Sequence, residues 1–202
     1  IGLKLLRSRR ETVSVEPFRP VDMAPFYDAL PFILTGAQRR CVDEAIADMT
    51  AGKSMNRLCQ GDVGSGKTMV AAACVYFCVK NGRQAALMAP TELLAEQHYR
   101  GLAPLLEQLG LRCALLTGST PAKTKRSVTA QLASGELDFA IGTHALISGG
   151  VAYANLGLVV TDEQHRFGVR QRETLAAKGK EPHVLVMSAT PIPRTLGLLM
   201  YG

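Results

Sequence analysis

The chain has 202 residues, of which 47% are hydrophobic and 20% are charged, and its formal net charge is +6. This length allows one sizeable α/β domain with its own core, and no apolar stretch approaches the length needed to cross a bilayer. The modest basic excess is compatible with a polyanionic partner, although many solvated surfaces have the same balance. We therefore expect a cytoplasmic protein with no membrane partner. Because the sequence begins at Ile1 and ends just after an apolar run, we also expect it to be a piece of a longer protein.

The beginning of the chain differs from the rest. Residues 1–29 lack sustained periodicity and contain several prolines, which predicts an N-terminal arm or linker. Residues 30–202 are expected to form the folded domain. Its first helix is indicated by apolar residues at every fourth position from Ala37 to Met49.

Neither the cysteines nor the histidines predict a metal site. Among the five scattered cysteines, Cys74 and Cys78 share a face of an apolar segment that has no histidine nearby. Buried, reduced thiols are therefore favoured over zinc ligands or disulfides. The histidines, which have no metal-ligand spacing, are His98, His144, His165 and His183.

The most informative motif is Gly61–Thr68, GDVGSGKT, which matches the pattern G-x-x-x-x-G-K-[ST] of a phosphate-binding loop. Its glycines let the backbone curl so that the N–H groups converge on phosphate oxygens. Lys67 would reach the β- and γ-phosphates, and the Thr68 hydroxyl would hold Mg²⁺. The apolar run Met69–Val79 predicts a helix whose N-terminus points at the same anion. The motif predicts nucleotide binding but not the use made of the nucleotide.

After the phosphate-binding loop, short apolar strands alternate with amphipathic helices. The predicted strands, apolar on both faces as in a buried parallel sheet, are Gln84–Ala89, Arg112–Leu116, Asp138–Ile141, Leu156–Thr161 and Val184–Met187. Thr91 is expected to open a helix over Glu92–Leu109. Thr120 is expected to cap another helix, which begins at Pro121 and ends at Gly135. The alternation predicts an α/β fold with a doubly wound, mostly parallel sheet and helices on both faces.

An acidic pair follows one of these strands. Ligands of an open parallel sheet bind at the carboxyl ends of its strands, and Asp162 and Glu163 follow Leu156–Thr161. Asp162 can accept Mg²⁺ or its water shell, while Glu163 can polarise the water that attacks a γ-phosphate. Alone, the pair would be a surface turn. Together with the phosphate-binding loop, it favours a catalytic role.

Other strand ends carry small polar groups whose roles stay open at this point. Ser188 and Thr190 either link the nucleotide pocket to a neighbouring surface or mark a strand-to-turn transition. Thr91 suits a nucleic-acid phosphate and is equally good as an ordinary helix cap. Gly118 and Thr143 also follow strands, and each is a weak signal alone.

The order of these segments resembles the motif series of superfamily 2 helicases. The series runs GDVGSGKT, APTELLAEQH, LLTGS, GTHALI, DEQH and SATPIPRT, over roughly residues 30–195. The DEQH box, the RFGVRQR after it and the final SATPIPRTLGLLMYG are similar to RecG-type ATP-dependent DNA helicases. The resemblance implies a RecA-like P-loop NTPase lobe, the first of two motor lobes, with ATP and Mg²⁺ as cofactors. It also implies a monomer that acts on DNA at branched junctions and stalled forks.

The resemblance further implies roles for the matching positions. On the nucleotide side, Gln38 and its neighbours would read adenine. The triphosphate and its metal would be held by Gly61, Gly64, Ser65, Gly66, Lys67 and Thr68. Asp162 would position the metal, Glu163 would be the catalytic carboxylate, and His165 would couple nucleotide state to DNA.

On the DNA side, the resemblance implies a grip on one strand by its backbone. The gripping residues would be Thr91, Gly118 and Thr143. Ser188 and Thr190 would couple hydrolysis to movement. The implied activity is branch migration, which remodels stalled forks in DNA repair and recombination.

The resemblance also limits what this chain can do alone. A second motor lobe would supply the arginine finger, which is typically worth about 10³–10⁵ in rate, so we expect weak nucleotide binding without useful hydrolysis. Transcription-repair coupling translocases, which share RFGV and TPIPRT but typically lack the histidine of the box, are the nearest alternative. A nucleotide- or DNA-binding module without turnover is another. A small-molecule kinase or a GTPase would leave the ordered DEQH and SATPIPRT segments unexplained. An RNA helicase is disfavoured because the box is DEQH and the residues around it match the DNA branch of the family.

Overall fold

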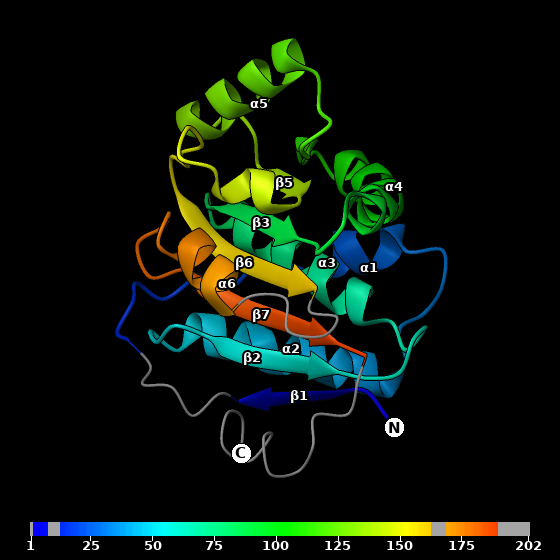
Figure 1. The fold of residues 1–202 in the computed structure, drawn as a ribbon. Helices are drawn as coiled ribbons and strands as arrows, with labels where there is room; N and C mark the ends of the chain where they lie inside the picture. The colour runs from blue at the N-terminus through cyan, green and yellow to red at the C-terminus, as the bar shows by residue number, and fades with distance from the viewer. Residues whose placement is uncertain (1, 8–12, 163–168, 190–202) are drawn as a thin grey trace.

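The computed structural model describes residues 2–7, 13–162 and 169–189, and within them one seven-stranded sheet runs through the molecule (Figure 1). The strand order is β1-β2-β7-β6-β3-β5-β4. β1 pairs antiparallel with β2, and every other pairing is parallel. The strands are β1 (Lys4–Arg7), β2 (Asn56–Gln60), β3 (Gln84–Met88), β4 (Cys113–Leu116), β5 (Phe139–Gly142), β6 (Leu156–Asp162) and β7 (His183–Ser188).

Helices cover both faces of this sheet. They are α1 (Ala24–Ala29), α2 (Gly36–Thr50), α3 (Lys67–Lys80), α4 (Glu92–Gln108), α5 (Ala122–Ser134), the short 3₁₀ helix η1 (His144–Ile147) and α6 (Val169–Ala176). Successive strand side chains point to opposite faces, so Leu87 packs in the cluster that contains α1 to α4, whereas Ala86 and Met88 pack in the cluster that contains α5, α6 and η1. The predicted doubly wound α/β fold is therefore confirmed.

Most predicted elements agree with the structure to within one or two residues, and the start of α5 is corrected. Pro121, not Thr120, is the N-cap residue, and the helix begins at Ala122. The Thr120 hydroxyl instead accepts a hydrogen bond from the Thr117 backbone N–H at 2.9 Å. It therefore closes the turn before the helix instead of capping it. Gly135, in the left-handed conformation, ends α5 as expected.

The first 29 residues contain regular structure that the sequence analysis did not expect. β1 adds an antiparallel edge strand to β2, and α1 buries Phe26 completely against the ring of Tyr76. Between them, Asn81 at the end of α3 holds the backbone of Arg19, accepting from its N–H at 2.7 Å and donating to its carbonyl at 3.2 Å. This segment thus packs on the domain, whereas the division at residue 30 stays a prediction.

Burial sets the chemistry of the cysteines. Four of them are buried, as expected, and Cys113 is partly exposed. Burial raises the pKa of Cys59 to about 12, so its thiol stays protonated at neutral pH. Among the described residues, none of the helices combines the length and apolar character that a membrane crossing needs.

Candidate nucleotide and nucleic-acid site

The parallel strands bring the predicted site residues to one edge of the sheet, here called the carboxyl edge. β2, β7 and β6 end at the phosphate-binding loop, at Ser188 and at Asp162. The next strands along the sheet, β3, β5 and β4, end shortly before Thr91, Thr143 and Gly118. The strand order thus separates the predicted nucleotide residues from the predicted DNA residues. With neighbouring strands about 4.8 Å apart, the two groups form two halves of one continuous edge.

The phosphate-binding loop joins β2 to α3 through backbone that only glycine adopts easily. Gly64 has φ +80° and Gly66 has φ +86°, both in the left-handed region. Gly66 is also the N-cap residue of α3, so the positive end of the helix dipole faces the loop. The loop is tied to the sheet because the Gly61 N–H donates to the Ser188 carbonyl at 3.2 Å. This is the geometry that binds an anion through backbone N–H groups.

Two side chains in this loop have the chemistry that a triphosphate needs. Lys67 Nζ donates to the carbonyl oxygens of Gly61 at 2.7 Å and Asp62 at 2.9 Å, which holds the ammonium over the loop. Ser65 Oγ is buried and lacks a hydrogen-bond partner among the described residues. Phosphate oxygens would give the ammonium a charged partner and the hydroxyl an acceptor. The loop therefore fits the phosphates of a nucleotide.

Gln38 connects the start of α2 to the phosphate-binding loop. Its Oε1 accepts from the Thr35 N–H at 2.9 Å, completing a capping box, and its Nε2 donates to the Ser65 carbonyl at 3.1 Å. Beside it, a cavity of about 390 Å³ lies between α1 and α2 and is lined in part by Phe32 and Ile33. Both apolar side chains are exposed, which leaves an uncovered apolar surface at this cavity. The predicted adenine-reading role of Gln38 stays a prediction.

The acidic end of β6 lies two strands from the phosphate-binding loop. Asp162 pairs in register with Met187 of β7 and is mostly buried. Its Oδ2 is 2.7 Å from His98 Nε2 of α4, a contact that the sequence analysis missed. Thr68, at the start of α3, and Asp162 are the described residues predicted to hold Mg²⁺. Glu163, His165 and Thr190 lie outside the described residues.

On the DNA half of the carboxyl edge, the three predicted positions differ in their hydrogen bonding. Thr91 caps α4, with its hydroxyl accepting from the Leu94 N–H at 3.2 Å. Beside Gly118, the Glu92 carboxylate accepts both the N–H of Ser119 at 3.0 Å and its hydroxyl at 2.8 Å. Thr143 is buried, and its hydroxyl has no hydrogen-bond partner within the described ranges. Contact with DNA through these residues stays a prediction, and Glu92 is a further polar residue that the sequence analysis missed.

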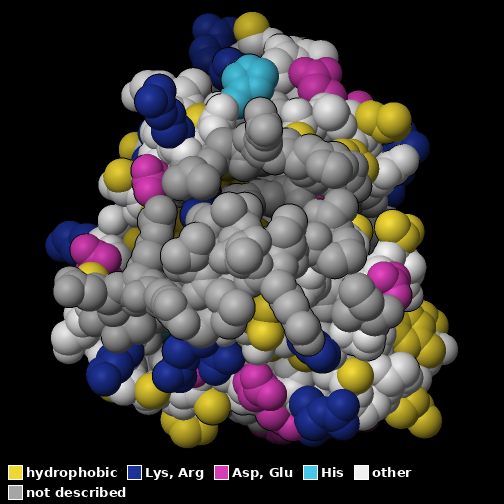
Figure 2. Space-filling view, turned by 60° about the horizontal axis from the view of Figure 1, so that its bottom comes forward, with side chains coloured by type: hydrophobic (Ala, Val, Ile, Leu, Met, Phe, Trp, Pro, Cys, Tyr) yellow, Lys and Arg dark blue, Asp and Glu magenta, His cyan; other side chains and the backbone are white. Residues whose placement is uncertain are grey.

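The charged side chains on one face of the molecule are mixed in sign. In the view of Figure 2, the coloured Lys and Arg side chains alternate with Asp and Glu around the face and form no continuous band among the described residues. On the face that Figure 2 shows, the described residues therefore give no sign of one extended basic surface.

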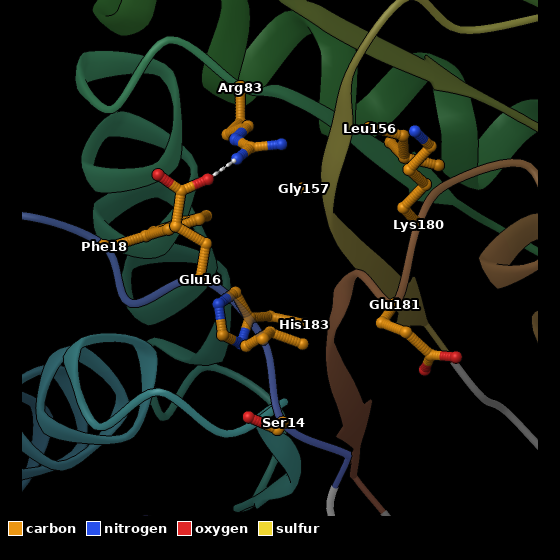
Figure 3. A pocket seen from close by; sticks show the side chains of 10 residues that line it. Ser14, Glu16, Phe18, Arg83, Leu156, Gly157, Lys180, Glu181 and His183 are labelled. Atoms are coloured by element: carbon orange, nitrogen blue, oxygen red, sulfur yellow. Dashed lines mark hydrogen bonds and ion pairs between the residues drawn. The ribbon is translucent and has the colours of Figure 1, made fainter.

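Another hollow lies at the opposite edge of the sheet, away from the predicted site residues (Figure 3). It has a volume of about 420 Å³ and is lined by the starts of β6 and β7 and by the segment before α1. Arg83 and Glu16, which both line it, form an ion pair of 2.8 Å at one side. Burial lowers the pKa of His183 to about 4, and its Nδ1 accepts from the Met55 N–H at 2.8 Å. The ion pair ties the N-terminal segment to the start of β3, and the His183 bond joins β7 to the residue before β2; neither contact gives a sign of phosphate chemistry.

The comparisons with known proteins agree with this geometry. The family model of the DEAD/DEAH box helicases matches residues 35–198. The chain is 56% identical over 177 residues to the ATP-dependent DNA helicase RecG of Synechocystis, covering 88% of this chain and 21% of that protein. It is 50% identical over 195 residues to RecG of Bacillus subtilis, covering 96% of this chain and 29% of that protein. The chain thus spans about a quarter of the length of these curated relatives.

A solved structure of RecG bound to a three-way DNA junction has a TM-score of 0.81 and 44% sequence identity, and the match covers 92% of this chain and 25% of that one. A DNA-bound structure of the helicase MrfA, with a TM-score of 0.64 and 19% identity, shows the shared fold alone. The resemblance to RecG-type helicases is therefore confirmed. Since the family model matches most of its length, the chain belongs to the DEAD/DEAH box helicase family.

Proposed function

We propose that this chain is the ATP-binding motor lobe of an ATP-dependent DNA helicase of the RecG type. The observation that carries the proposal is the carboxyl edge, where the strand order puts the phosphate-binding loop and Asp162 on one half and Thr91 and Gly118 on the other. A motor has to connect nucleotide chemistry to its grip on DNA, and one rigid sheet joins both halves. The relatives named ATP-dependent DNA helicase RecG support the same reading.

On the nucleotide half, each residue has a role that its surroundings allow. Lys67 would exchange its two carbonyl partners for β- and γ-phosphate oxygens, and the N–H groups at the start of α3 would bind phosphate oxygens as well. Thr68 and Asp162 would hold Mg²⁺, which neutralises charge on the phosphates when bound. Glu163 would orient the attacking water, and His165 would report the nucleotide state to the DNA half.

On the DNA half, the proposed grip is on the phosphate backbone. Thr91 at the start of α4, Gly118 in the loop before α5 and Thr143 after β5 would approach one strand. Ser188 and Thr190 would pass the consequence of hydrolysis to this grip. In the full-length natural protein, we propose that the resulting movement drives branch migration of three- and four-way junctions and remodels stalled forks. The RecG structure bound to a three-way junction supports a branched substrate.

The 202-residue chain alone is proposed to bind nucleotide weakly and to lack useful turnover. An arginine finger in this reaction class is worth about 10³–10⁵ in rate, and the proposed motor takes its finger from a second lobe. Robust DNA-stimulated ATP hydrolysis by the chain alone would contradict this part of the proposal.

The proposal is tested by ATP hydrolysis and junction unwinding in the full-length natural protein. Lys67→Ala and Glu163→Gln should abolish both activities, because each removes a group proposed to act on the γ-phosphate. Lys80→Ala is the matched control: it also removes a lysine from α3, but at the end of the helix far from the phosphate-binding loop. Retention of junction unwinding by either of the first two variants would rule out the proposed enzyme. A stronger response to structured RNA than to a DNA junction would rule out the proposed substrate.

A further inference from the structure

Helix α4 contacts both halves of the carboxyl edge. At its start, Glu92 holds Ser119 through two hydrogen bonds, in the loop that contains Gly118. Six residues later, about 9 Å along the helix, His98 contacts Asp162 at the end of β6. One rigid element thus contacts the proposed DNA loop and the proposed metal carboxylate.

The contact with Asp162 is short and sheltered. His98 Nε2 lies 2.7 Å from Asp162 Oδ2, and the two side chains are only 13% and 15% exposed. An ionised carboxylate only accepts hydrogen bonds, so Nε2 carries the proton and donates it. The bond occupies Oδ2, and it fixes the direction in which Oδ1 points.

We propose that His98 is a positioning residue, which orients Asp162 for Mg²⁺ and makes α4 the link between DNA binding and the metal–nucleotide site. The inference rests on the proposed function, since it assigns the metal to Asp162. Carboxylates that bind a metal are themselves held by hydrogen bonds, and loss of such a partner typically costs about 10–100-fold in metal affinity or activity. His98 supplies this bond from a helix whose first turn also holds the proposed DNA loop.

The link has a thermodynamic consequence. If DNA at the loop of Gly118 shifts α4, then DNA changes the affinity for Mg²⁺–nucleotide, and Mg²⁺–nucleotide changes the affinity for DNA by the same factor. Removing the His98 side chain abolishes only the contact between α4 and Asp162. The Glu92–Ser119 contact and the phosphate-binding loop both stay intact.

The test measures equilibrium binding of a fluorescent ADP analogue to the full-length natural protein as Mg²⁺ is varied, with and without a three-way DNA junction. In His98→Ala, the Mg²⁺ concentration for half-saturation should rise about 10-fold or more. The effect of the junction on this value should disappear. Binding of the analogue in EDTA should not change. His98→Gln should recover most of the loss, because its amide can donate from a position close to that of Nε2.

The control is His144→Ala, since His144 is an exposed histidine next to the same edge of the sheet. It should leave every value unchanged. A folded His98→Ala protein, with the melting temperature of the wild type and an unchanged Mg²⁺ requirement, would overturn the inference while leaving the proposed function intact. Failure of His98→Gln to recover the loss would overturn it as well. A wild-type protein that binds no nucleotide in the presence of Mg²⁺ would overturn the proposed function and this inference together.

Discussion

The contact between Gly66 and Gln38 allows a quantitative test of the phosphate-binding loop. An alanine at Gly66 has two separate costs. Its φ of +86° is left-handed, which costs a residue with a Cβ about 1–2 kcal/mol. In addition, the new Cβ would overlap the Gln38 amide, which would then have to leave its positions on Ser65 and Thr35.

The second cost can be measured apart from the first. Gly64 has a similar φ of +80°, but a Cβ built there meets nothing within 4 Å. Gly64→Ala should therefore cost about 1–2 kcal/mol from backbone strain alone. Gly66→Ala should cost about 3–4 kcal/mol, since each of the two displaced hydrogen bonds adds about 1 kcal/mol. The excess of Gly66→Ala over Gly64→Ala is the contribution of the Gln38 contact.

Urea unfolding of a double-mutant cycle measures this contribution directly. In a Gln38→Ala background the overlap is absent, so Gly66→Ala should then cost no more than Gly64→Ala does. The coupling energy between Gln38 and Gly66 should be about 1 kcal/mol or more. If Gly66→Ala and Gly64→Ala cost the same in the wild-type background, or if the costs of Gln38→Ala and Gly66→Ala simply add, the reasoning is refuted.

Two further predictions concern parts of the chain outside the candidate site. The pKa of His183 is about 4 in the folded protein, below the ordinary value of 6.5, so the unfolded chain binds more protons than the folded protein between these two pH values. The contribution of neutral, buried His183 to the free energy of unfolding is therefore complete above pH 6.5 and is lost as the pH falls towards 4. This histidine should therefore account for about 2 kcal/mol of the stability lost between pH 7 and pH 5. In chemical unfolding, His183→Asn should remove this part of the pH dependence while its Oδ1 still accepts from the Met55 N–H, whereas the matched His144→Asn should not remove it. An unchanged dependence of the free energy of unfolding on pH in His183→Asn would contradict the role given to His183. Phe26→Ala should lower the free energy of unfolding by about 3–5 kcal/mol, because Phe26 is fully buried. Phe32→Ala should lower it by about 0.5 kcal/mol or less, because Phe32 is 47% exposed. Equal losses in the two variants would show that α1 is not part of the core.

The strands that could be predicted from the sequence are those with continuous apolar runs; all of them except the edge strand β4 are almost completely buried. β3 to β7 are continuous apolar runs, and that composition is typical of a parallel sheet covered by helices. β2 was missed because Arg57 interrupts its apolar pattern. In the structure this guanidinium is paired with Asp48 at 2.6 Å, a partner that only the packing of α2 supplies. β1 was missed for a related reason, since only Leu5 and Leu6 of its four residues are apolar and charged residues stand at both of its ends.

The candidate site also contains features that could be predicted from the sequence and features that could not. The phosphate-binding loop is local in sequence, so its residues and its left-handed glycines could be predicted from the motif alone. The contact between His98 and Asp162 joins residues 64 positions apart, and nothing in the spacing of the histidines indicates it. Glu92 was equally hidden, because an acidic residue in the first turn of a helix is common for reasons of the helix dipole. Both contacts depend on where α4 lies over the edge of the sheet.

The proposed motor depends on the binding of ATP phosphates by Gly61–Thr68. This binding is tested most directly by calorimetric titration of the chain with Mg²⁺ and a non-hydrolysable ATP analogue, beside the Lys67→Ala variant and the Lys80→Ala control. We predict measurable binding by the wild type and by Lys80→Ala, and its loss in Lys67→Ala, because the proposed phosphate partner is then gone. Equal binding by Lys67→Ala and the wild type would contradict the proposed role of Gly61–Thr68.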